Sequence, residues 1–314
     1  MKSVLVTGGA GFIGSHLVDA LLSRGCEVGV LDDFSTGTES NLSPNLNRVR
    51  LHRGSITDRN FTRIAVSGYG AVLHDAARVN VTHSVEDPVD TNHVNVEGTL
   101  NLLEAARDSG VQTFVYASSS SVYGETEKLP KEESMPPMPV SPYAVSKLAG
   151  ENYCKVFSSV YGLKTVSLRY FNVYGPRQKS GPYSGVIPAF VKGALAGERL
   201  VISGDGTQTR DFVYVKDVVR ANLLCLDSAL KGGEVYNVGS NQRTSINEVA
   251  RLVYKLTGNK NTTPNHVPPR RGDVLHSYAD ITRISSELGY EPSYTIESGL
   301  MEVVEWWRSS SLVS

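Results

Sequence analysis

The sequence lacks several features that would each indicate a particular class of protein. Its 314 residues carry a net charge of −1, so there is no excess of positive charge of the kind that binds nucleic acid. No apolar run approaches the ~20 residues that a membrane-spanning helix needs. The first residues lead straight into a predicted strand, without a signal peptide. We therefore expect a cytoplasmic protein that binds neither nucleic acid nor membrane.

Cysteine and clustered histidine are also scarce. The three cysteines, Cys26, Cys154 and Cys225, lack the C-x-x-C spacing of a zinc or redox site. They predict small core residues in a reducing compartment. The seven histidines form no ligand cluster along the chain, so we predict no structural or catalytic metal.

Glycine, by contrast, is concentrated directly after the first predicted strand, residues 4–7. Gly8, Gly11 and Gly14 follow this strand at three-residue intervals, and a helical pattern comes next. These glycines permit a tight turn, close approach of the backbone to a pyrophosphate, and close packing of the helix on the strand. The amides at the helix start would face the pyrophosphate. A glycine-rich turn without a ligand is the alternative. The predicted cofactor contacts here are Gly8, Gly11, Phe12, Ile13 and Gly14.

An acidic pair ends the second predicted strand, residues 27–31. Asp32 and Asp33 lie about twenty positions past the glycine turn, where a carboxylate bonds the ribose hydroxyls of adenosine. Asp32 would repel a 2′-phosphate, so NAD is favoured over NADP. A loop-capping role for Asp32 is the alternative, and the spacing argues against it.

The following segments alternate between strands and helices. Strands are predicted over residues 49–52, 71–74, 112–117 and 164–169, and helices over 88–108 and 143–161. The pattern predicts an α/β fold of Rossmann type, with a doubly wound parallel sheet. In such a sheet ligands bind at the carboxyl ends of the strands. The residues that follow strands there are Ser55, Ile56, Ala76, Ala77, Ser118, Ser119, Ser120 and Ser121.

The composition changes after Asn172, where segments shorten and glycine and proline become denser. We therefore predict a cofactor-binding domain over residues 1–172 and a smaller substrate-binding domain over 173–314. Residues 212–215 and 235–238 are strand-like and are expected to return to the first domain. The two domains would then be interleaved near 211–239.

Tyr143 and Lys147 carry the predicted chemistry. Their i, i+4 spacing places both side chains on one face of a helix. A neighbouring ammonium favours the phenolate and so would lower the pKa of Tyr143 from ~10, which suits proton transfer near neutral pH. A serine hydroxyl at the end of strand five could bond the same substrate oxygen. A plain exposed pair is the alternative, but the glycine motif and the serines precede this pair in the required order.

The runs TGGAGFIG, ASSSSVYG, YAVSK, RYFNVYGP and GDGTQTRDFVYVKD together resemble the extended short-chain dehydrogenase/reductase family over essentially the full length. Within it, the chain is most similar to the UDP-hexose 4-epimerases, in the branch that accepts N-acetylhexosamines. The resemblance implies NAD as cofactor and a UDP-sugar as substrate. It also implies a homodimer built from the helices near 90–108 and 143–161.

The resemblance also assigns roles to single residues. Tyr143 resembles the general base and acid, Lys147 the lysine that bonds the nicotinamide ribose, and Ser119 the hydroxyl that bonds the reacting sugar oxygen. Many relatives carry an aspartate that bonds adenine where this chain has Ser55, which can still accept a hydrogen bond. Two further residues, Asn95 and Tyr170, are expected at the cofactor.

The expected substrate contacts lie mostly in the second half of the chain. The resemblance places Asn172 near the phosphates of the nucleotide sugar, and Arg210, Arg270 and Asp273 at the diphosphate and uridine. Arginine suits a diphosphate because its planar fork donates paired hydrogen bonds. The remaining expected contacts are Val186 and Ile187 along the uracil and Ser121 near the sugar. For Val186 and Ile187, packing in the core is the alternative.

The type of reaction follows from what stands after the catalytic hydroxyl. Dehydratases and decarboxylases of the family carry an acidic residue there, whereas this chain has Ser120 and Ser121. A serine cannot protonate a leaving hydroxyl as a carboxylic acid does, so epimerisation without net oxidation is favoured. Three alternatives stay open: a UDP-uronate 4-epimerase, a nucleotide-sugar dehydrogenase or reductase, and an NAD-sensing regulator without turnover.

Ser277 bears on the breadth of substrates. In the resembling epimerases the residue at this position lines the pocket beside the C2 substituent of the sugar, and relatives restricted to glucose and galactose carry a tyrosine there. Serine leaves room for an acetamido group, which a packed tyrosine would exclude. We therefore expect UDP-GlcNAc and UDP-GalNAc to be substrates beside UDP-glucose and UDP-galactose. A turn-capping role for Ser277 is the alternative.

Overall fold

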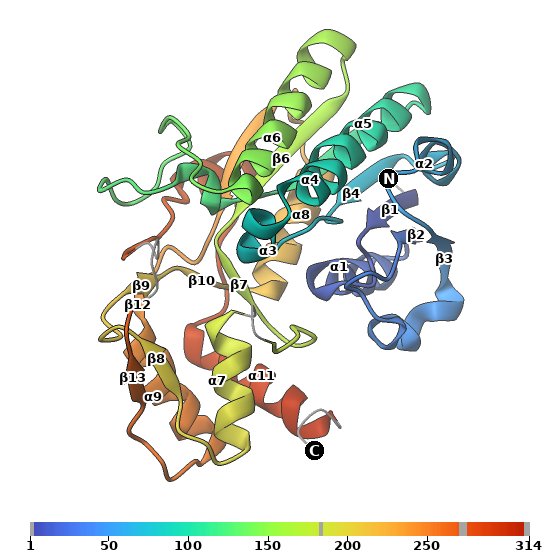
Figure 1. Ribbon diagram of the computed structural model, residues 1–314. Helices are drawn as coiled ribbons and strands as arrows, with labels where there is room; N and C mark the ends of the chain where they lie inside the picture. Colours follow the sequence, from blue (N-terminus) through green and yellow to red (C-terminus); the bar gives the residue numbers. More distant parts are fainter. Residues whose placement is uncertain (1–2, 182–184, 270–274, 311–314) are drawn as a thin grey trace.

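The computed structural model describes residues 3–181, 185–269 and 275–310. A seven-stranded sheet forms the centre of the molecule, with the strand order β11-β6-β5-β4-β1-β2-β3 (Figure 1). Every neighbouring pair is parallel, which confirms the predicted Rossmann-type sheet. The strands are β1 (Ser3–Thr7), β2 (Glu27–Asp32), β3 (Val49–Arg53), β4 (Ala71–His74), β5 (Thr113–Ser119), β6 (Lys164–Tyr170) and β11 (Glu234–Val238).

Helices cover both faces of this sheet. Because successive side chains of a strand point to opposite faces, Val4 and Val6 of β1 pack against one helical layer and Leu5 against the other. One layer consists of α1 (Phe12–Ser23) and α8 (Val215–Asp227), and the other contains α2 (Arg59–Val66), α5 (Gly98–Asp108) and α6 (Pro142–Tyr161). Burial on both faces explains why the strands are nearly continuous apolar runs.

The segment predicted as one helix over residues 88–108 is helical throughout, as expected, but it contains a wider turn that the sequence did not indicate. It consists of α4 (Pro88–Asn92), a π-helical turn (His93–Glu97) and α5, and the short helix α3 (Val81–Glu86) precedes it. Turns of this wider kind occur frequently at functional sites. Here the wider turn contains Asn95, a buried residue whose side chain bonds the loop after β4.

A smaller lobe lies beside the carboxyl ends of the strands, with its own apolar core. In Figure 1 it occupies the lower part of the molecule, below the sheet. Its main helices are α7 (Val186–Leu195), α9 (Ile246–Thr257) and α11 (Ile296–Ser309), whereas α10 (Thr282–Leu288) packs against β11 of the central sheet. The short strands pair as β8 (Val201–Ser203) with β13 (Asn265–Val267), and β9 (Thr209–Arg210) with β12 (Thr244–Ser245).

Two strand-like segments were expected to return to the first domain, and their positions differ. β11 forms the edge of the central sheet beside β6. β10 (Phe212–Tyr214) pairs instead with β7 (Asn172–Tyr174) in a separate two-stranded sheet. α8, which follows β10 directly, packs against α1 on the central sheet. The chain therefore passes between the two lobes more than once, and a boundary at residue 172 stays a prediction.

No helix within the described part of the chain has the length and apolar character needed to cross a membrane. Two of the cysteines predicted in the core, Cys154 and Cys225, are buried, and Cys26 is partly buried.

Candidate active site

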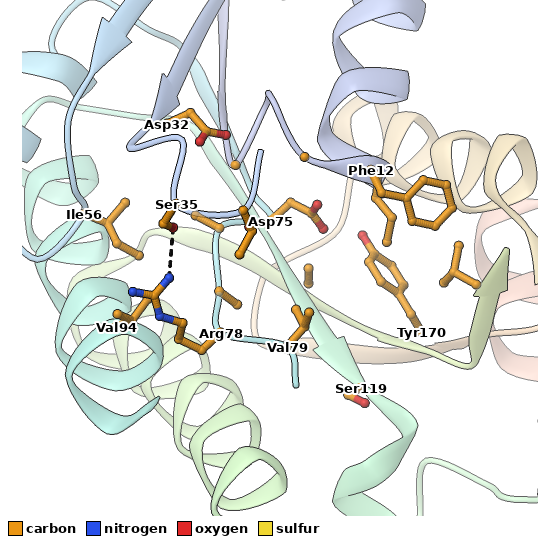
Figure 2. A pocket seen from close by; sticks show the side chains of 18 of the residues that line it. Phe12, Asp32, Ser35, Ile56, Asp75, Arg78, Val79, Val94, Ser119 and Tyr170 are labelled. Carbon is orange, nitrogen blue, oxygen red and sulfur yellow. Dashed lines mark hydrogen bonds between the residues drawn. The ribbon is translucent and has the colours of Figure 1, made fainter. Parts of the chain in front are cut away.

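A cavity of about 500 Å³ lies over the carboxyl ends of the strands, at the point where the strand order reverses between β1 and β4 (Figure 2). This is the position at which doubly wound sheets bind their ligands. Thirteen of the fifteen predicted cofactor contacts line it, and only Gly14 and Asn95 do not. Those that do are Gly8, Gly11, Phe12, Ile13, Asp32, Asp33, Ser55, Ile56, Ala76, Ala77, Tyr143, Lys147 and Tyr170.

The glycine turn forms one wall of this cavity and fits a dinucleotide. Gly8 has a φ of +69°, and a Cβ there would lie 2.7 Å from the backbone nitrogen of Ala76. A Cβ on Gly14 would lie 2.1 Å from the carbonyl oxygen of Gly8. Gly14 therefore lies beneath the turn, where it permits close packing of α1 on β1, and does not line the cavity. Only glycine at these positions leaves the backbone open to a diphosphate.

Asp32 and Asp33 line the cavity beside the glycine turn, at the end of β2. The carboxylate of Asp32 accepts hydrogen bonds from the amides of Ala10 (2.9 Å) and Phe34 (2.8 Å), so it holds the glycine turn in place. The capping role considered as an alternative is therefore present. Each carboxylate oxygen has a further lone pair, which leaves capacity for a ribose hydroxyl. Burial raises the pKa of Asp32, although both amides oppose this.

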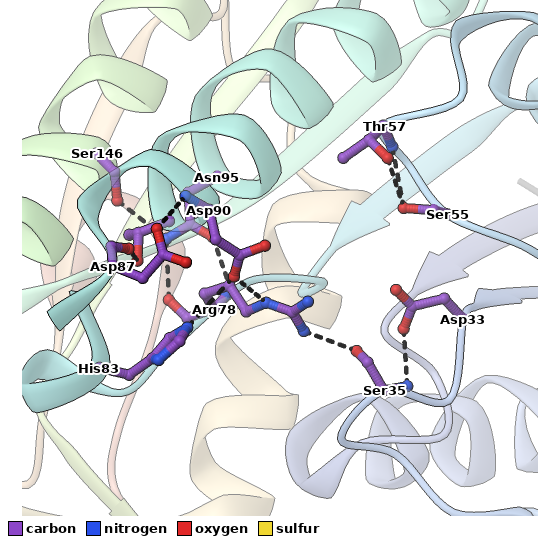
Figure 3. Close-up of polar contacts among 11 residues, drawn as sticks. Asp33, Ser35, Ser55, Thr57, Arg78, His83, Asp87, Asp90, Asn95 and Ser146 are labelled. Carbon is purple, nitrogen blue, oxygen red and sulfur yellow. Dashed lines mark hydrogen bonds and ion pairs between the residues drawn. The ribbon is translucent and has the colours of Figure 1, made fainter.

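Asn95 and Ser55 support the cavity in different ways (Figure 3). Asn95 does not reach the cavity, because its amide group is used against the loop after β4. It accepts from the amide of Arg78 (2.7 Å) and donates to the carbonyl oxygen of Arg78 (2.9 Å) and to Ser146 Oγ (2.9 Å). Asn95 therefore positions that loop, and its direct contact with the cofactor stays a prediction. Ser55 lines the cavity and bonds the side chain of Thr57 (2.9 Å).

Ser119, Tyr143 and Lys147 come together at the inner end of the cavity. Ser119 is the last residue of β5, and the two others lie one turn apart near the start of α6. The helix begins where it does because Ser141 Oγ accepts a hydrogen bond from the amide of Ala144 (3.2 Å). The hydroxyl of Ser119 lies near enough to Tyr143 to lower the pKa of the phenol, and Ser119 Oγ accepts a hydrogen bond from the amide of Ser121 (3.2 Å). The structure thus assembles the three predicted catalytic side chains from two separate elements.

The pKa of Tyr143 contradicts the expectation from sequence. Burial raises the pKa of Tyr143 to about 12, and the neighbouring Ser119 opposes this rise. The ammonium of Lys147 lies 6.0 Å from the centroid of the Tyr143 ring and donates to the carbonyl oxygen of Ala117 (2.8 Å). The spacing i, i+4 brings the two side chains to one helix face, but it does not bring the ammonium onto the hydroxyl. Loss of hydration therefore outweighs the lysine.

A second cavity, of about 350 Å³, lies in the smaller lobe. The predicted substrate contacts Asn172, Val186, Ile187 and Arg210 line it. Arg210 donates to the carbonyl oxygens of Thr209 (3.0 Å) and Leu275 (3.2 Å), which orients its side chain. The two cavities are adjacent, because both are lined by Val173, Gln178 and Gly185.

Four other predicted substrate contacts have different outcomes. Ser121 lines neither cavity, but its hydroxyl is buried and has no hydrogen-bond partner among the described residues. Ser277 also lines neither cavity, and its amide donates to the carbonyl oxygen of Thr209 (3.1 Å), next to Arg210. The predicted diphosphate and uridine contacts Arg270 and Asp273 lie outside the described residues.

Four charged cavity residues escaped the sequence reasoning: Asp75, Arg78, Arg177 and Lys179. Asp75 and Arg78 follow β4, and both line the larger cavity. The guanidinium of Arg78 reaches across it to Ser35 Oγ (2.9 Å) in the loop after β2, as Figure 2 shows. The one sequence signal for Asp75 and Arg78 was their position just after a predicted strand. Only the small residues between them, Ala76 and Ala77, were predicted as cofactor contacts from that position. Among the described residues, no cluster of His, Cys, Asp or Glu suits a metal ion.

Comparison with known proteins agrees with this geometry. The model of the NAD dependent epimerase/dehydratase family matches residues 4–239. UDP-glucose 4-epimerase from Thermotoga maritima, solved with UDP-glucose, is 41% identical, with a TM-score of 0.93 and coverage of 98% of this chain and 99% of that one. UDP-glucose 4-epimerase from Thermus thermophilus, solved with NAD, is 41% identical (TM-score 0.90; 99% and 100% covered). UDP-N-acetylglucosamine 4-epimerase from Methanobrevibacter ruminantium, solved with UDP-N-acetylmuramic acid, is 38% identical (TM-score 0.94; 98% and 98% covered).

Proposed function

The chain belongs to the NAD-dependent epimerase/dehydratase family, and from this premise we propose that it is an NAD-dependent UDP-hexose 4-epimerase. Its proposed substrates are UDP-glucose and UDP-galactose, together with UDP-GlcNAc and UDP-GalNAc. The observation that carries this proposal is the placement of Ser119, Tyr143 and Lys147 in a dinucleotide-shaped cavity that adjoins a second cavity lined by Arg210. One cavity suits the cofactor and the other the nucleotide of the substrate.

The cofactor and the chain would divide the chemistry between them. The glycine turn and Asp32 would hold NAD⁺, which would supply reversible hydride transfer at C4 of the sugar without net oxidation. Tyr143 would remove the proton of the C4 hydroxyl and later return it. Ser119, whose hydroxyl lowers the pKa of Tyr143, would bond the same sugar oxygen and keep it oriented.

The residues after Ser119 support epimerisation rather than elimination. Ser120 and Ser121 begin a 3-10 turn, and no carboxylic acid stands there to protonate a leaving hydroxyl. The buried Ser121 hydroxyl is suited instead to a neutral hydrogen bond with the sugar.

The function is tested by incubating the purified protein with each UDP-sugar and separating the products by chromatography, while absorbance reports the cofactor. We expect interconversion of the two hexose pairs without net NADH. Stoichiometric free NADH would indicate a dehydrogenase, and turnover of UDP-glucuronate alone a uronate epimerase. Binding of NAD without turnover of any sugar would indicate a regulator.

Acceptance of the acetylated sugars is proposed to depend on Ser277. Its amide bonds Thr209, so it lies beside Arg210 and the second cavity. We expect Ser277→Tyr to lose activity on UDP-GlcNAc and UDP-GalNAc and to keep it on UDP-glucose and UDP-galactose, because the ring fills the space of the acetamido group. Equal loss on both pairs, or no activity of the wild type on UDP-GlcNAc, would contradict this role.

A further inference from the structure

Asp75 lies where the cofactor cavity, the catalytic lysine and the glycine turn meet. In the register of the sheet, His74 of β4 pairs with Thr7 of β1 on one side and with Tyr116 of β5 on the other. Asp75, the next residue, therefore stands beside Gly8 and Ala117. Ala117 is the residue whose carbonyl oxygen accepts from Lys147 Nζ (2.8 Å). Figure 2 shows the Asp75 carboxyl projecting into the cavity, close to the ring of Tyr170.

Lys147 needs a counter-charge at this depth. Its side chain is 3% exposed, and burial lowers the pKa of Lys147 because the ammonium loses its hydration. One backbone carbonyl provides a dipole but no full negative charge. An isolated buried ammonium tends to lose its proton unless a carboxylate compensates it.

Three carboxylates line the cavity, and they differ in whether they can compensate the positive charge of Lys147. Asp32 uses both oxygens on the amides of Ala10 and Phe34, and Asp33 accepts from the amide of Ser35 (2.9 Å) at the exposed rim. Only the Asp75 charge acts on Lys147, and it raises the pKa of the ammonium against the effect of burial. Asp75 is thus the cavity carboxylate placed to balance the lysine.

The groups around Asp75 shift its pKa in both directions. Burial raises the pKa of Asp75. Lys147 from α6 and the amide of Gly14 at the start of α1 lower it, and Asp32 from β2 raises it slightly. The Asp75 charge in turn raises the pKa values of Tyr143 on α6 and Tyr170 on β6. Its strand neighbour His74 is held neutral by burial, which lowers its pKa to about 3.

We propose that Asp75 is a positioning residue for the reaction: its carboxylate keeps Lys147 protonated and so sets the upper pH limit at which the Tyr143–Lys147 pair works. The effect on the pH range of catalysis rests on the proposed function. The effect of Asp75 on the protonation of Lys147 does not depend on it.

The link can be measured without turnover. The full-length protein is treated briefly with acetic anhydride over a range of pH, and acetylation of Lys147 is read by mass spectrometry, because only the uncharged amine reacts. In Asp75→Asn, which keeps the shape and removes the charge, we expect the midpoint of labelling to move to lower pH by about one unit. The matched control Asp33→Asn, in the same cavity, is expected to keep the wild-type midpoint, and so is Asp75→Glu.

The catalytic consequence is read from the pH dependence of kcat/KM. The alkaline limb of Asp75→Asn is expected to move to lower pH by the same amount as the labelling midpoint, whereas a purely structural role would lower activity equally at every pH. An unmoved labelling midpoint in Asp75→Asn, or an equal shift in Asp33→Asn, overturns the proposal. If labelling shifts as expected and the wild type turns over no UDP-sugar, the proposed function fails and the role of Asp75 toward Lys147 stands.

Discussion

At the scale of single residues, burial raises the pKa of the Tyr143 hydroxyl and the neighbouring Ser119 opposes this rise. Tyr143→Phe removes the hydroxyl proposed as general base and acid and keeps the ring. We expect turnover of UDP-glucose to fall by about 10²–10⁴-fold, the usual contribution of general acid–base help, with NAD binding unchanged. Steady-state rates and an NAD titration check this. Turnover within a few-fold of the wild type would show that another group is the base.

His74 predicts how stability depends on pH. Its ring bonds Thr7 (2.8 Å) and Thr99 (2.9 Å), and burial lowers its pKa from 6.5 to about 3. The unfolded chain therefore binds this proton first as the pH falls, and stability is lost from about pH 6.5 down to about pH 3. Between about pH 7 and pH 5 the histidine should account for roughly 2 kcal/mol of that loss.

The variant His74→Asn isolates this contribution, since an amide can bond the threonines but does not titrate. Its free energy of unfolding in urea should be lower than that of the wild type near neutral pH. Its further loss on going to about pH 5 should be smaller by the same roughly 2 kcal/mol. If the two proteins lose equal stability over this interval, His74 is not the group responsible.

At the scale of elements, Arg78 ties the loop after β4 to the loop after β2 across the cofactor cavity. Its Nη1 donates to Ser35 Oγ (2.9 Å), and its Nε donates to Asp90 of α4 (2.8 Å) (Figure 3). We expect Arg78→Ala to weaken NAD binding by about tenfold, because a hydrogen bond to a charged group contributes roughly 1.5–3 kcal/mol. The loops would then no longer be held together over the cofactor.

Calorimetric titration with NAD measures this effect, and Ser35→Ala should show a smaller one. The rate at saturating NAD should stay near that of the wild type, since the side chain of Arg78 bonds Ser35 and Asp90 and none of the three proposed catalytic residues. The matched control is Arg63→Ala, which removes an ion pair of α2 with Asp108 on the outer surface. An NAD affinity that is unchanged in Arg78→Ala would contradict the bridging role.

At the scale of the whole molecule, α6 presents an apolar stripe to solvent. Val145, Val156 and Val160 are 53%, 47% and 65% exposed, and they recur at the helical period on one face. The neighbouring helices α3 and α4 add Val85 and Val89, which are 63% and 76% exposed. Five exposed valines on three helices that pack against one another favour a protein interface, and we propose that α6 and the helices beside it form a homodimer.

This dimer is tested by light scattering coupled to size exclusion. The double substitution Val156→Glu and Val160→Glu should convert a dimeric wild type to a monomer, because two buried unpaired charges per chain destabilise an interface. The control Ile64→Glu changes an equally exposed residue of α2 and should leave the mass unchanged. A monomeric wild type, or a dimer that survives the double substitution, would contradict the proposal.

The sequence by itself determined the sheet, the glycine turn and which side chains are proposed as catalytic. These depend on local rules: Val4 to Thr7 form a strand because they are apolar and end at Gly8, and Tyr143 and Lys147 share a helix face because they are four residues apart. The order of motifs along the chain then places them at one edge of a parallel sheet. Cavity-lining residues such as Asp32 and Ile56 follow from that arrangement.

Only the tertiary structure decided the electrostatics and the supporting contacts. The π-helical turn that buries Asn95, the reach of Arg78 to Ser35 and the position of Asp75 beside Ala117 all join elements that are distant along the chain. The pKa of Tyr143 was expected to fall because Lys147 is near in sequence, yet it rises because the surrounding elements exclude water. Spacing along a helix determines which face a side chain occupies, whereas hydration and the nearest charge depend on everything packed against that face.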